Sequence, residues 1–350
     1  MAIDTKFYTS KELQIGVAID SSTVGTAASS FTAIEAESIT LPTLNDYMEE
    51  RRGGAASGTF VSEADLFKYE NGSVHEVSAS GFMTDELQAI LMPNAFGQGF
   101  AGNPDAIALT VANNQVNKTF THNETAAADK TLSFAINGVG DTGGDPAEFN
   151  DCIILSGCVI TSLTLNWDAN EDGGRIKFDL TAQTRTKTSA YDTAASIGVY
   201  STNYCYGTKY NSTWKLMDAD VFYKTWSLAI ENPVSFLGSS GSAATSLVDG
   251  EPQTYIRSVP EMNITFSSVV KYDTNLDSLW TTARGTGTNA TNASTNGVLI
   301  TDNSNNFIIN IEKCSIEEIA FDEGDFLGLS TTLKARSSSG TNIINYVFNQ

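Results

Sequence analysis

Basic residues are scarce in this sequence. Among its 350 residues, 20 Lys and Arg stand against 41 Asp and Glu, so the formal net charge at pH 7 is −21. Proteins that hold nucleic acids do so largely through Lys and Arg contacts to phosphates, which this composition does not favour. The sequence also lacks an uncharged apolar run of the ~18 residues that a membrane-spanning helix needs. These two absences argue against a protein that grips DNA and against a helix that spans a bilayer.

Cysteine, proline and histidine are also few, with 4, 7 and 2 residues respectively. The cysteines Cys152, Cys158, Cys205 and Cys314 match no zinc-binding spacing and include no CxxC pair. The first six residues do not carry the apolar segment of a secretory signal peptide. We therefore expect a chain made in the cytoplasm, with reduced thiols. The 28 Gly and the many Ser, Thr and Asn residues favour strands and turns over a helical bundle.

Recognisable catalytic motifs are missing as well. Neither His75 nor His122 lies in a pattern typical of a Ser-His-Asp site. The G-x-S-x-G motif of a nucleophilic serine does not occur. Asp141-Thr142-Gly143 matches the tripeptide of aspartic proteases, but that chemistry needs two facing carboxylates, and the second half of the chain has no such tripeptide. The sequence therefore predicts a protein that is not an enzyme and uses no cofactor.

One segment has the oxygen-rich spacing of a calcium loop. Asp168, Asn170 and Asp172 alternate before Gly173, and Asp179 follows at the twelfth position. The flanking residues predict strands rather than the helices of an EF-hand, and Asp replaces the bidentate Glu. The same residue types suit a hairpin turn that needs positive φ. We prefer the turn, and we keep these residues as a weak calcium candidate.

The same order of elements occurs twice along the chain. In each repeat, a predicted strand precedes a long Gly- and Ser-containing excursion, an alternating strand and a short amphipathic helix. Both excursions end in a similar tetrapeptide, at 73–76 and 258–261. The predicted first strands are 31–41 and 225–234, the excursions are 42–72 and 235–257, and the alternating strands are 77–82 and 262–270.

Both repeats then close with a pair of strands. The first pair is 158–165 and 175–185, and the second is 314–321 and 326–336. Cys158 aligns with Cys314, and Leu165 aligns with Phe321. Because order and spacing agree, we interpret the chain as a tandem duplication. The alternation of apolar and polar residues in these strands predicts a sheet with one buried face and one solvated face.

The predicted fold is mainly β, with two tandem antiparallel β-sandwich or open-barrel domains that each carry one short α-helix. The first domain takes residues 1–187 and includes an insertion at 93–151 that is peculiar to it. Residues 188–214 are predicted to be a linker, and residues 215–350 the second domain.

This order of elements resembles that of the major tail tube proteins of long-tailed, non-contractile bacteriophages. The residues that carry the resemblance are 31–41, 73–91 and 158–185, repeated by 225–234, 258–280 and 314–336. The duplication departs from the common family member, which has one such domain, although some long-tailed phages carry a doubled version. The resemblance implies a fold of the tail tube type and a structural protein of the virion tail, made and assembled in the bacterial host cytoplasm.

The resemblance also implies self-assembly. Family members form rings whose inner strands join into one β-barrel, and the rings stack into a hollow tube. Six domains with four inner strands each would give about 24 strands and a backbone diameter of roughly 50 Å, which leaves room for duplex DNA of about 20 Å. Three chains would then close a pseudo-hexameric ring, and a ring of six chains is the alternative. The implied partners are further copies of the chain, the tape measure protein and double-stranded DNA in the lumen, and tail-tip and terminator proteins at the ends.

Two groups of residues are candidates for these contacts. A lumen lined by carboxylates repels DNA phosphates, and the lumen-facing candidates are Glu35, Glu37 and Glu231, with Glu37 and Glu231 equivalent in the two repeats. The excursion at 44–54 mixes charged and apolar residues, as expected of an interface with an apolar centre and a charged rim. The ring-stacking candidates are Tyr47, Met48, Glu49, Glu50, Arg51, Arg52 and Phe60.

Two other functions compete with the tail tube. A related tail component, such as a distal-tail or terminator protein, shares the implied fold but stops at one ring. A carbohydrate- or surface-binding β-sandwich protein would expose an aromatic platform, for which Trp214, Trp226 and Tyr255 are the candidates. Polymerisation into long filaments discriminates between a tube protein and these alternatives.

Overall fold

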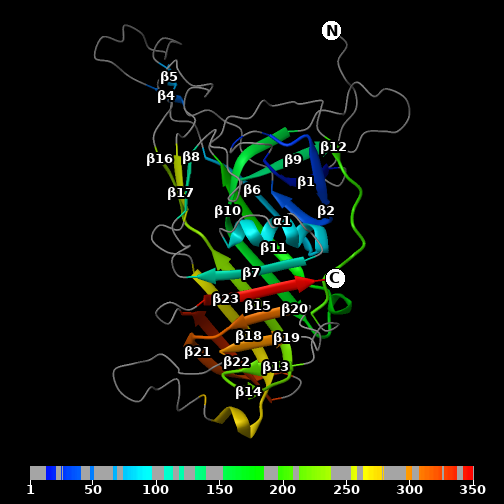
Figure 1. Cartoon of the computed structure of the whole chain (residues 1–350), viewed down its shortest axis with the longest axis vertical. Helices are drawn as coiled ribbons and strands as arrows, with labels where there is room; N and C mark the ends of the chain where they lie inside the picture. The colour runs from blue at the N-terminus through cyan, green and yellow to red at the C-terminus, as the bar shows by residue number, and fades with distance from the viewer. Residues whose placement is uncertain are drawn as a thin grey trace.

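The computed structural model describes the following residues of the chain: 13–20, 25, 27–40, 48–50, 66–68, 74–96, 106–112, 118–121, 131–138, 153–184, 196–207, 213–237, 254–257, 263–277, 279, 297–301, 307–324, 327–336 and 342–349. Within them the chain is mainly β, as the sequence predicted, and its longest described α-helix is α1 (Asp85–Ala95) (Figure 1). Thr84 caps α1, because its hydroxyl accepts a hydrogen bond from the Leu87 N–H.

The strands fall into two series along the chain. Those up to residue 184 are β1 (Leu13–Ile19), β2 (Ser30–Ile34), β3 (Ala36–Thr40), β4 (Met48–Glu50), β5 (Leu66–Lys68), β6 (His75–Phe82), β7 (Ala106–Ala112), β8 (Lys118–Thr121), β9 (Leu132–Gly138), β10 (Ile153–Asp168) and β11 (Lys177–Thr184). The rest are β12 (Ser196–Ile197), β13 (Thr213–Leu216), β14 (Ala219–Asp220), β15 (Tyr223–Glu231), β16 (Val234–Leu237), β17 (Thr254–Arg257), β18 (Asn263–Lys271), β19 (Val298–Thr301), β20 (Phe307–Ile311), β21 (Cys314–Glu323), β22 (Leu327–Ala335) and β23 (Asn342–Asn349).

Eight of these strands form one continuous antiparallel sheet, which we call the main sheet. Its order is β3, β6, β11, β10, β15, β18, β22, β21. The first four strands come from the first half of the chain and the last four from the second half. In both halves the chain visits its four strands in the same spatial order, and β10 and β15 join the halves.

The same β-bulges occur in both halves. One extra residue interrupts β10 against β11 at Thr161, and one interrupts β21 against β22 at Glu317. A second pair of bulges lies at Glu37 in β3 and at Lys224 in β15. Bulges fix the phase of side-chain alternation, so they mark corresponding positions independently of sequence identity. The register agrees with the predicted alignment of Cys158 with Cys314 and of Leu165 with Phe321.

The bulges correct another predicted alignment. They make Glu37 the counterpart of Lys224, whereas the sequence aligned Glu37 with Glu231. The segment 31–41 is not one strand, because it breaks at Glu35 between β2 and β3, and these two strands pair with different partners. The counterpart of β3 is therefore 223–227 rather than the middle of 225–234.

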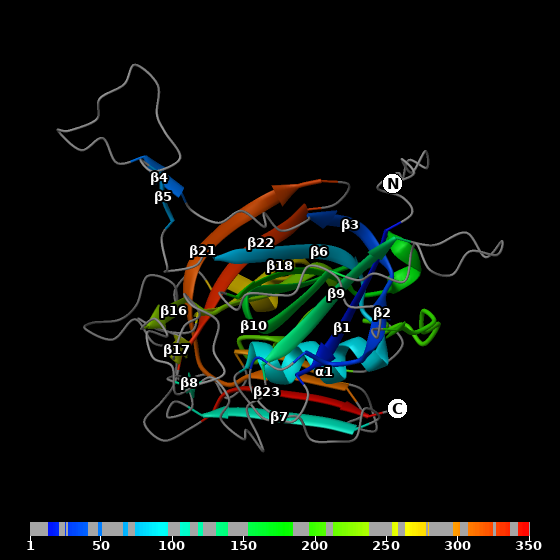
Figure 2. The same cartoon turned by 90° about the horizontal axis from the view of Figure 1, so that it is seen from above.

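A second layer of strands packs on one side of the main sheet. In the first half its order is β2, β1, β9 and the start of β10, and in the second half it is β14, β13, β19 and β20. β9 lies inside the predicted insertion 93–151 but takes the place that β19 takes in the second half. The additional strands β23 and β7 extend the second layer beyond β20. Figure 2 shows α1, β23 and β7 on the same side of the main sheet.

The two layers enclose one hydrophobic core that runs through both halves. Its buried members include Phe134 and Phe178 of the first half and Phe266 and Phe307 of the second. In the second half, the described residues at the place of α1 begin with a 3₁₀ helix (Thr274–Leu276), and Asp277 and Leu279 after it are α-helical. Each excursion carries a hairpin, β4–β5 or β16–β17, and β17 also pairs with β8.

Asp20 holds the bend where β10 passes from the second layer into the main sheet. Its buried carboxylate accepts hydrogen bonds from the Thr131 and Ser133 hydroxyls and from the Gly25 and Gly157 N–H groups. Gly157 adopts φ 67° between the two halves of β10. Two effects act on the pKa of Asp20 in opposite directions. Burial raises it and the four hydrogen bonds lower it, and burial has the larger effect, so the pKa lies above its ordinary value of 3.8.

This shift predicts a pH dependence of stability. The native chain binds the Asp20 proton more tightly than the unfolded chain, so the stabilisation is complete below pH 3.8 and is lost as the pH rises through the folded-state pKa. We expect the unfolding free energy of the native sequence, relative to that of Asp20→Asn, to fall over this interval. Urea unfolding of both proteins across a pH series measures it, and a difference that stays flat or rises with pH contradicts the prediction.

Candidate assembly surface

One face of the main sheet, opposite the second layer, carries mostly small polar side chains. We call it the open face, and its residues alternate along each strand with those buried in the core. The register aligns them in rows across the strands. One row is Thr40, Ser78, Thr181, Ser162, Glu231 and Asn263, and the next is Ser38, Ser80, Asp179, Thr164, Ala229, Thr265 and Lys334.

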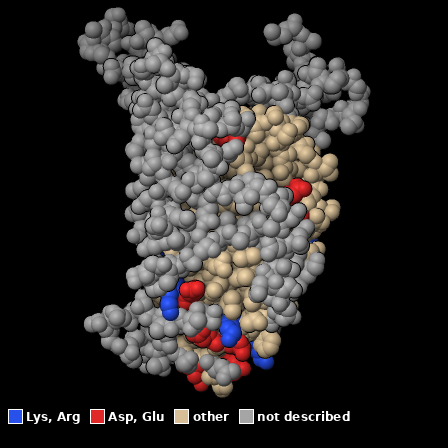
Figure 3. Space-filling model, in the orientation of Figure 1, with Lys and Arg blue, Asp and Glu red and all other residues tan. Residues whose placement is uncertain are grey.

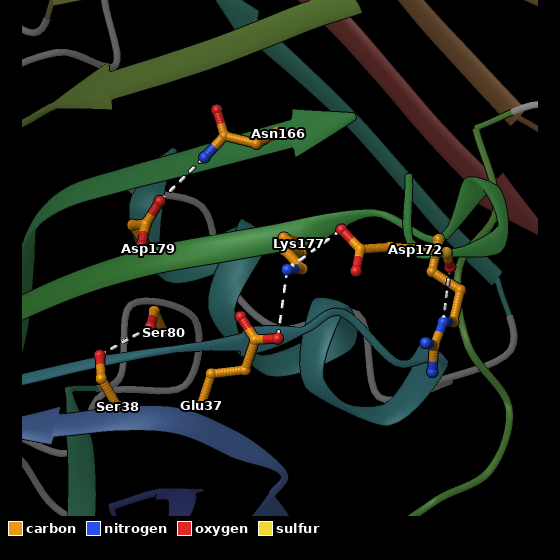
Figure 4. Close-up of polar contacts among 8 residues, drawn as sticks. Glu37, Ser38, Ser80, Asn166, Asp172, Lys177 and Asp179 are labelled. Atoms are coloured by element: carbon orange, nitrogen blue, oxygen red, sulfur yellow. Dashed lines mark hydrogen bonds and ion pairs between the residues drawn. The ribbon is translucent and has the colours of Figure 1, made fainter. Parts of the chain in front are cut away.

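Hydroxyl groups link neighbouring strands on this face. The Ser38 and Ser80 hydroxyl oxygens are 2.7 Å apart, and those of Ser78 and Thr181 are 3.2 Å apart. The Asn166 amide donates to the Asp179 carboxylate at 2.8 Å (Figure 4). These short side chains stand close to the backbone and satisfy one another, so the face is polar without long projecting groups.

Lys177 pairs with two carboxylates at the start of β11. Its ammonium nitrogen lies 3.0 Å from Asp172 and 3.1 Å from Glu37 (Figure 4). The hydrogen bond to Asp172, followed by that to Glu37, raises the pKa of Lys177 above its ordinary value of 10.5. All three side chains are partly exposed, so these ion pairs organise the surface more than they stabilise the fold.

The predicted lumen-facing residues do not all share one environment. Glu37 and Glu231 lie on the open face, at the bulge of β3 and at the end of β15. Glu35 lies between β2 and β3, where its carboxylate accepts a hydrogen bond of 2.5 Å from the Tyr204 hydroxyl. The guanidinium of Arg175 lies 4.9 Å from the Tyr204 ring centroid. Glu35 is thus tied to residues 196–207, which the sequence assigned to the linker.

The weak calcium candidate is not assembled. Asp172 pairs with Lys177, and Asp179 accepts from Asn166 on the neighbouring strand. Asp168 accepts from the Asn170 N–H at 2.7 Å within the turn, and Asp172 and Gly173 adopt φ 53° and 65°. In the part of the chain that the structure describes, no three His, Cys, Asp or Glu side chains gather as metal ligands. These residues form the hairpin turn that the sequence also allowed.

Three of the ring-stacking candidates lie in the β4–β5 hairpin. Met48, Glu49 and Glu50 form β4, which pairs with β5. Tyr47, Arg51, Arg52 and Phe60 lie outside the described residues. Figures 1 and 2 both show β4 and β5 standing away from the main sheet.

The two described candidates for an aromatic platform pack into the core. Trp226 is buried in the core, with 2% of its surface exposed. Trp214 packs against Trp167 and Tyr223, with ring centroids 5.8 Å apart in both pairs. The side chain of Tyr255 lies outside the described residues. The predicted candidates therefore offer no described ring face for stacking a sugar.

The main sheet ends in two edges that have no further strand partner among the described residues. These edges are β3 and β21. Phe321 on β21 and Leu327 at the start of β22 are 51% and 53% exposed, although both belong to the apolar side of the sheet. Sequence reasoning missed this edge. The alignment of Phe321 with the buried Leu165 was the signal that pointed to it.

A shallow hollow lies on the open face where the two halves meet. It has a volume of about 380 Å³ and is lined in part by Asn166, Asp168, Lys177, Thr225, Ser227 and Ser267. It is open to solvent and its lining is mixed, with Trp167, Trp226 and Val269 beside the polar residues, unlike the enclosed apolar pockets that hold small ligands. Figure 3, seen from the side of α1 and β23, shows described charged side chains gathered near the end of the molecule where β13 and β14 lie.

Comparison with known proteins does not identify the chain. No protein-family model matches the sequence, and no curated protein is similar to it. Among the described residues, no helix has the length and apolar character required to cross a membrane.

Proposed function

We propose that this chain is a structural virion protein that self-assembles into stacked rings and forms the tail tube of a long-tailed bacteriophage. The observation that carries the proposal is the main sheet. It repeats one four-stranded unit, presents an open polar face, and ends in two edges that are unpaired among the described residues. Edge strands of this kind favour pairing with another chain, and a closed barrel removes them.

Three chains suit this geometry. With eight strands from each chain, a spacing of ~4.8 Å and a tilt of ~45°, the barrel has about 24 strands and a backbone diameter of roughly 50 Å. The alternation of the two halves around the ring gives it pseudo-six-fold symmetry. The pairing of β10 with β15 favours this ring over one of six chains, because both halves already contribute to a single sheet.

The open face suits the wall of a DNA channel. Acidic side chains outnumber basic ones on this face. The basic residues are Lys177, Lys224, Lys271, Lys334 and Arg336, and the acidic residues are Glu37, Glu76, Asp168, Asp179, Glu231, Glu318 and Asp322. Such a surface repels DNA phosphates and gives them no basic patch to hold. The short hydroxyl side chains leave the lumen wide. Duplex DNA can therefore pass without binding.

The β4–β5 hairpin is the candidate for contacts between stacked rings. This hairpin suits contact with an adjacent ring, because it stands away from the main sheet. Within such a tube, the tape measure protein and then DNA occupy the lumen, and tail-tip and terminator proteins bind the two ends. The site of action is the virion tail, after assembly in the host cytoplasm.

Electron microscopy of the purified, concentrated protein tests the proposal. We expect hollow tubes of uniform diameter in negative stain. Single rings that do not stack would instead favour a distal-tail or terminator protein. A monomer that forms neither rings nor tubes, even when supplied with fragments of assembled tube as seeds, would contradict the proposal.

A further inference from the structure

The junction between the two halves shows how such sheets join. β10 and β15 pair so that Leu165 lies opposite Leu228 and Trp167 opposite Trp226. The rings of Trp167 and Trp226 stack with centroids 6.2 Å apart. Leu165 is 1% exposed and Trp226 is 2% exposed. Contact between these two strands therefore buries the apolar side of both.

The two outer edges are the counterparts of these joined strands. Register and bulges make β21 correspond to β10 and β3 correspond to β15. Phe321 takes the position of Leu165, yet 51% of its surface is exposed. Ile39 takes the position of the buried Trp226 and is only partly buried. Each outer edge thus has a partly exposed apolar side chain at a position whose counterpart in the internal junction is buried.

The two halves also differ beside the final closing strand, where Leu327 of β22 is the counterpart of Ile176. In the first half, Met83 N–H donates to the Ile176 carbonyl at 2.8 Å, and in the second half Tyr272 N–H donates to the Leu327 carbonyl at 3.1 Å. In the first half, Cys205 adds two further backbone hydrogen bonds. The Ile176 N–H donates to the Cys205 carbonyl, and the Cys205 N–H donates to the Met83 carbonyl. Ile176 is 1% exposed, whereas its counterpart Leu327 is 53% exposed.

We propose that β21 of one chain pairs antiparallel with β3 of a neighbouring chain in the register of β10 and β15. Transfer of that register places Asp322 opposite Thr40, Glu323 opposite Ile39, and Gly324 opposite Ser38. The pairing covers Phe321.

The partner strand at each of these edges therefore belongs to a second copy of the chain. The pairing of edges follows from the internal junction alone, and its closure into a ring of three rests on the proposed function. Residues directly opposite in an antiparallel pair have Cβ atoms about 4.5–5.5 Å apart, within reach of a slightly adjusted disulfide, whereas diagonal neighbours are about 7–8 Å apart and out of reach. The yield of disulfide therefore shows which residues of β21 and β3 lie directly opposite one another.

Cysteine cross-linking of the assembled, full-length protein tests the register. The variant Thr40→Cys with Asp322→Cys is made in a Cys152→Ser background. Burial raises the pKa of Cys158 and Cys205, and raises that of Cys314 to about 12, so these thiols stay protonated and unreactive. The matched control, Thr40→Cys with Ala320→Cys, moves one cysteine two residues along the same face of β21.

After oxidation, denaturing gels should show covalent dimers and trimers in the first variant, at least about tenfold more than in the control, and all should revert on reduction. Equal cross-linking of both variants, or none in rings seen by electron microscopy, overturns the register and leaves the tail tube proposal standing. Strong cross-linking of the first variant alone, in assemblies that are open chains instead of rings, supports the register and counts against the tube.

Discussion

Replacement of Phe321 by Asp is expected to abolish ring assembly while the isolated chain stays folded. In the isolated chain this side chain is 51% exposed, so a carboxylate there remains hydrated. In the proposed junction the same carboxylate is buried among apolar groups without a partner. Such a burial costs about 3 kcal/mol or more per junction, which weakens association at least ~100-fold. Analytical ultracentrifugation across a concentration series measures the loss, and urea unfolding checks the fold.

Val199→Asp is the matched control for this variant. Val199 is an apolar residue that is 92% exposed, and it lies in the segment 196–207, which belongs to neither β3 nor β21. The same change in charge at this position should leave assembly within about threefold of the native value, because exposed charges of this kind contribute little. Rings from Phe321→Asp at native concentrations would show that β21 is not buried between chains.

Truncation of Trp226 to Ala is expected to destabilise the chain by about 3–5 kcal/mol, which is a large part of the stability of a typical domain. Trp226 stacks between Trp167 and Phe266, with centroid distances of 6.2 and 6.3 Å. The cavity left by its removal lies where the two halves meet, and the core is continuous there. Both halves should therefore unfold together at a lower urea concentration, as far-ultraviolet circular dichroism would show.

Trp226→Phe separates lost packing from lost hydrogen bonding. The buried indole N–H of Trp226 has no hydrogen-bond partner among the described residues, so Phe removes an unpaired donor and keeps an aromatic ring. We expect a cost of about 1–2 kcal/mol, well below that of Ala. If Phe and Ala prove equally costly, the stack is not what joins the halves.

Much of the main sheet could be predicted from the sequence, because its signals are local. Alternation along 175–185 and 326–336 gave the strands, and the matching residues before them gave the alignment of Cys158 with Cys314. Oxygen- and Gly-rich residues between β10 and β11 gave the turn. These features depend on neighbours in the chain, which sequence patterns record well.

The alignment of the first strands failed for a physical reason. A bulge at Glu37 and another at Lys224 reverse the alternation of side chains, so the period of two cannot fix the register across them. The break at Glu35 also divides one apparent strand between two layers. Glu37 and Glu231 consequently share a face without being counterparts.

The contact between the halves lay beyond sequence reasoning altogether. β10 and β15 are separated in the chain by β11, the described segment 196–207, β13 and β14, and no local pattern predicts that they pair. The exposure of Phe321 likewise becomes meaningful only when it is compared with that of Leu165 across the internal junction. Long-range pairing therefore supplied the part of the site on which the proposed assembly depends.

Electron cryo-microscopy of assembled tubes in cross-section tests the central claim most directly, because it counts chains and strands around the lumen. The account predicts three chains per ring, one continuous barrel of about 24 strands, and β21 of each chain beside β3 of the next. A ring of six chains with the second halves outside the barrel, or a lumen wall interrupted at β21, would contradict it.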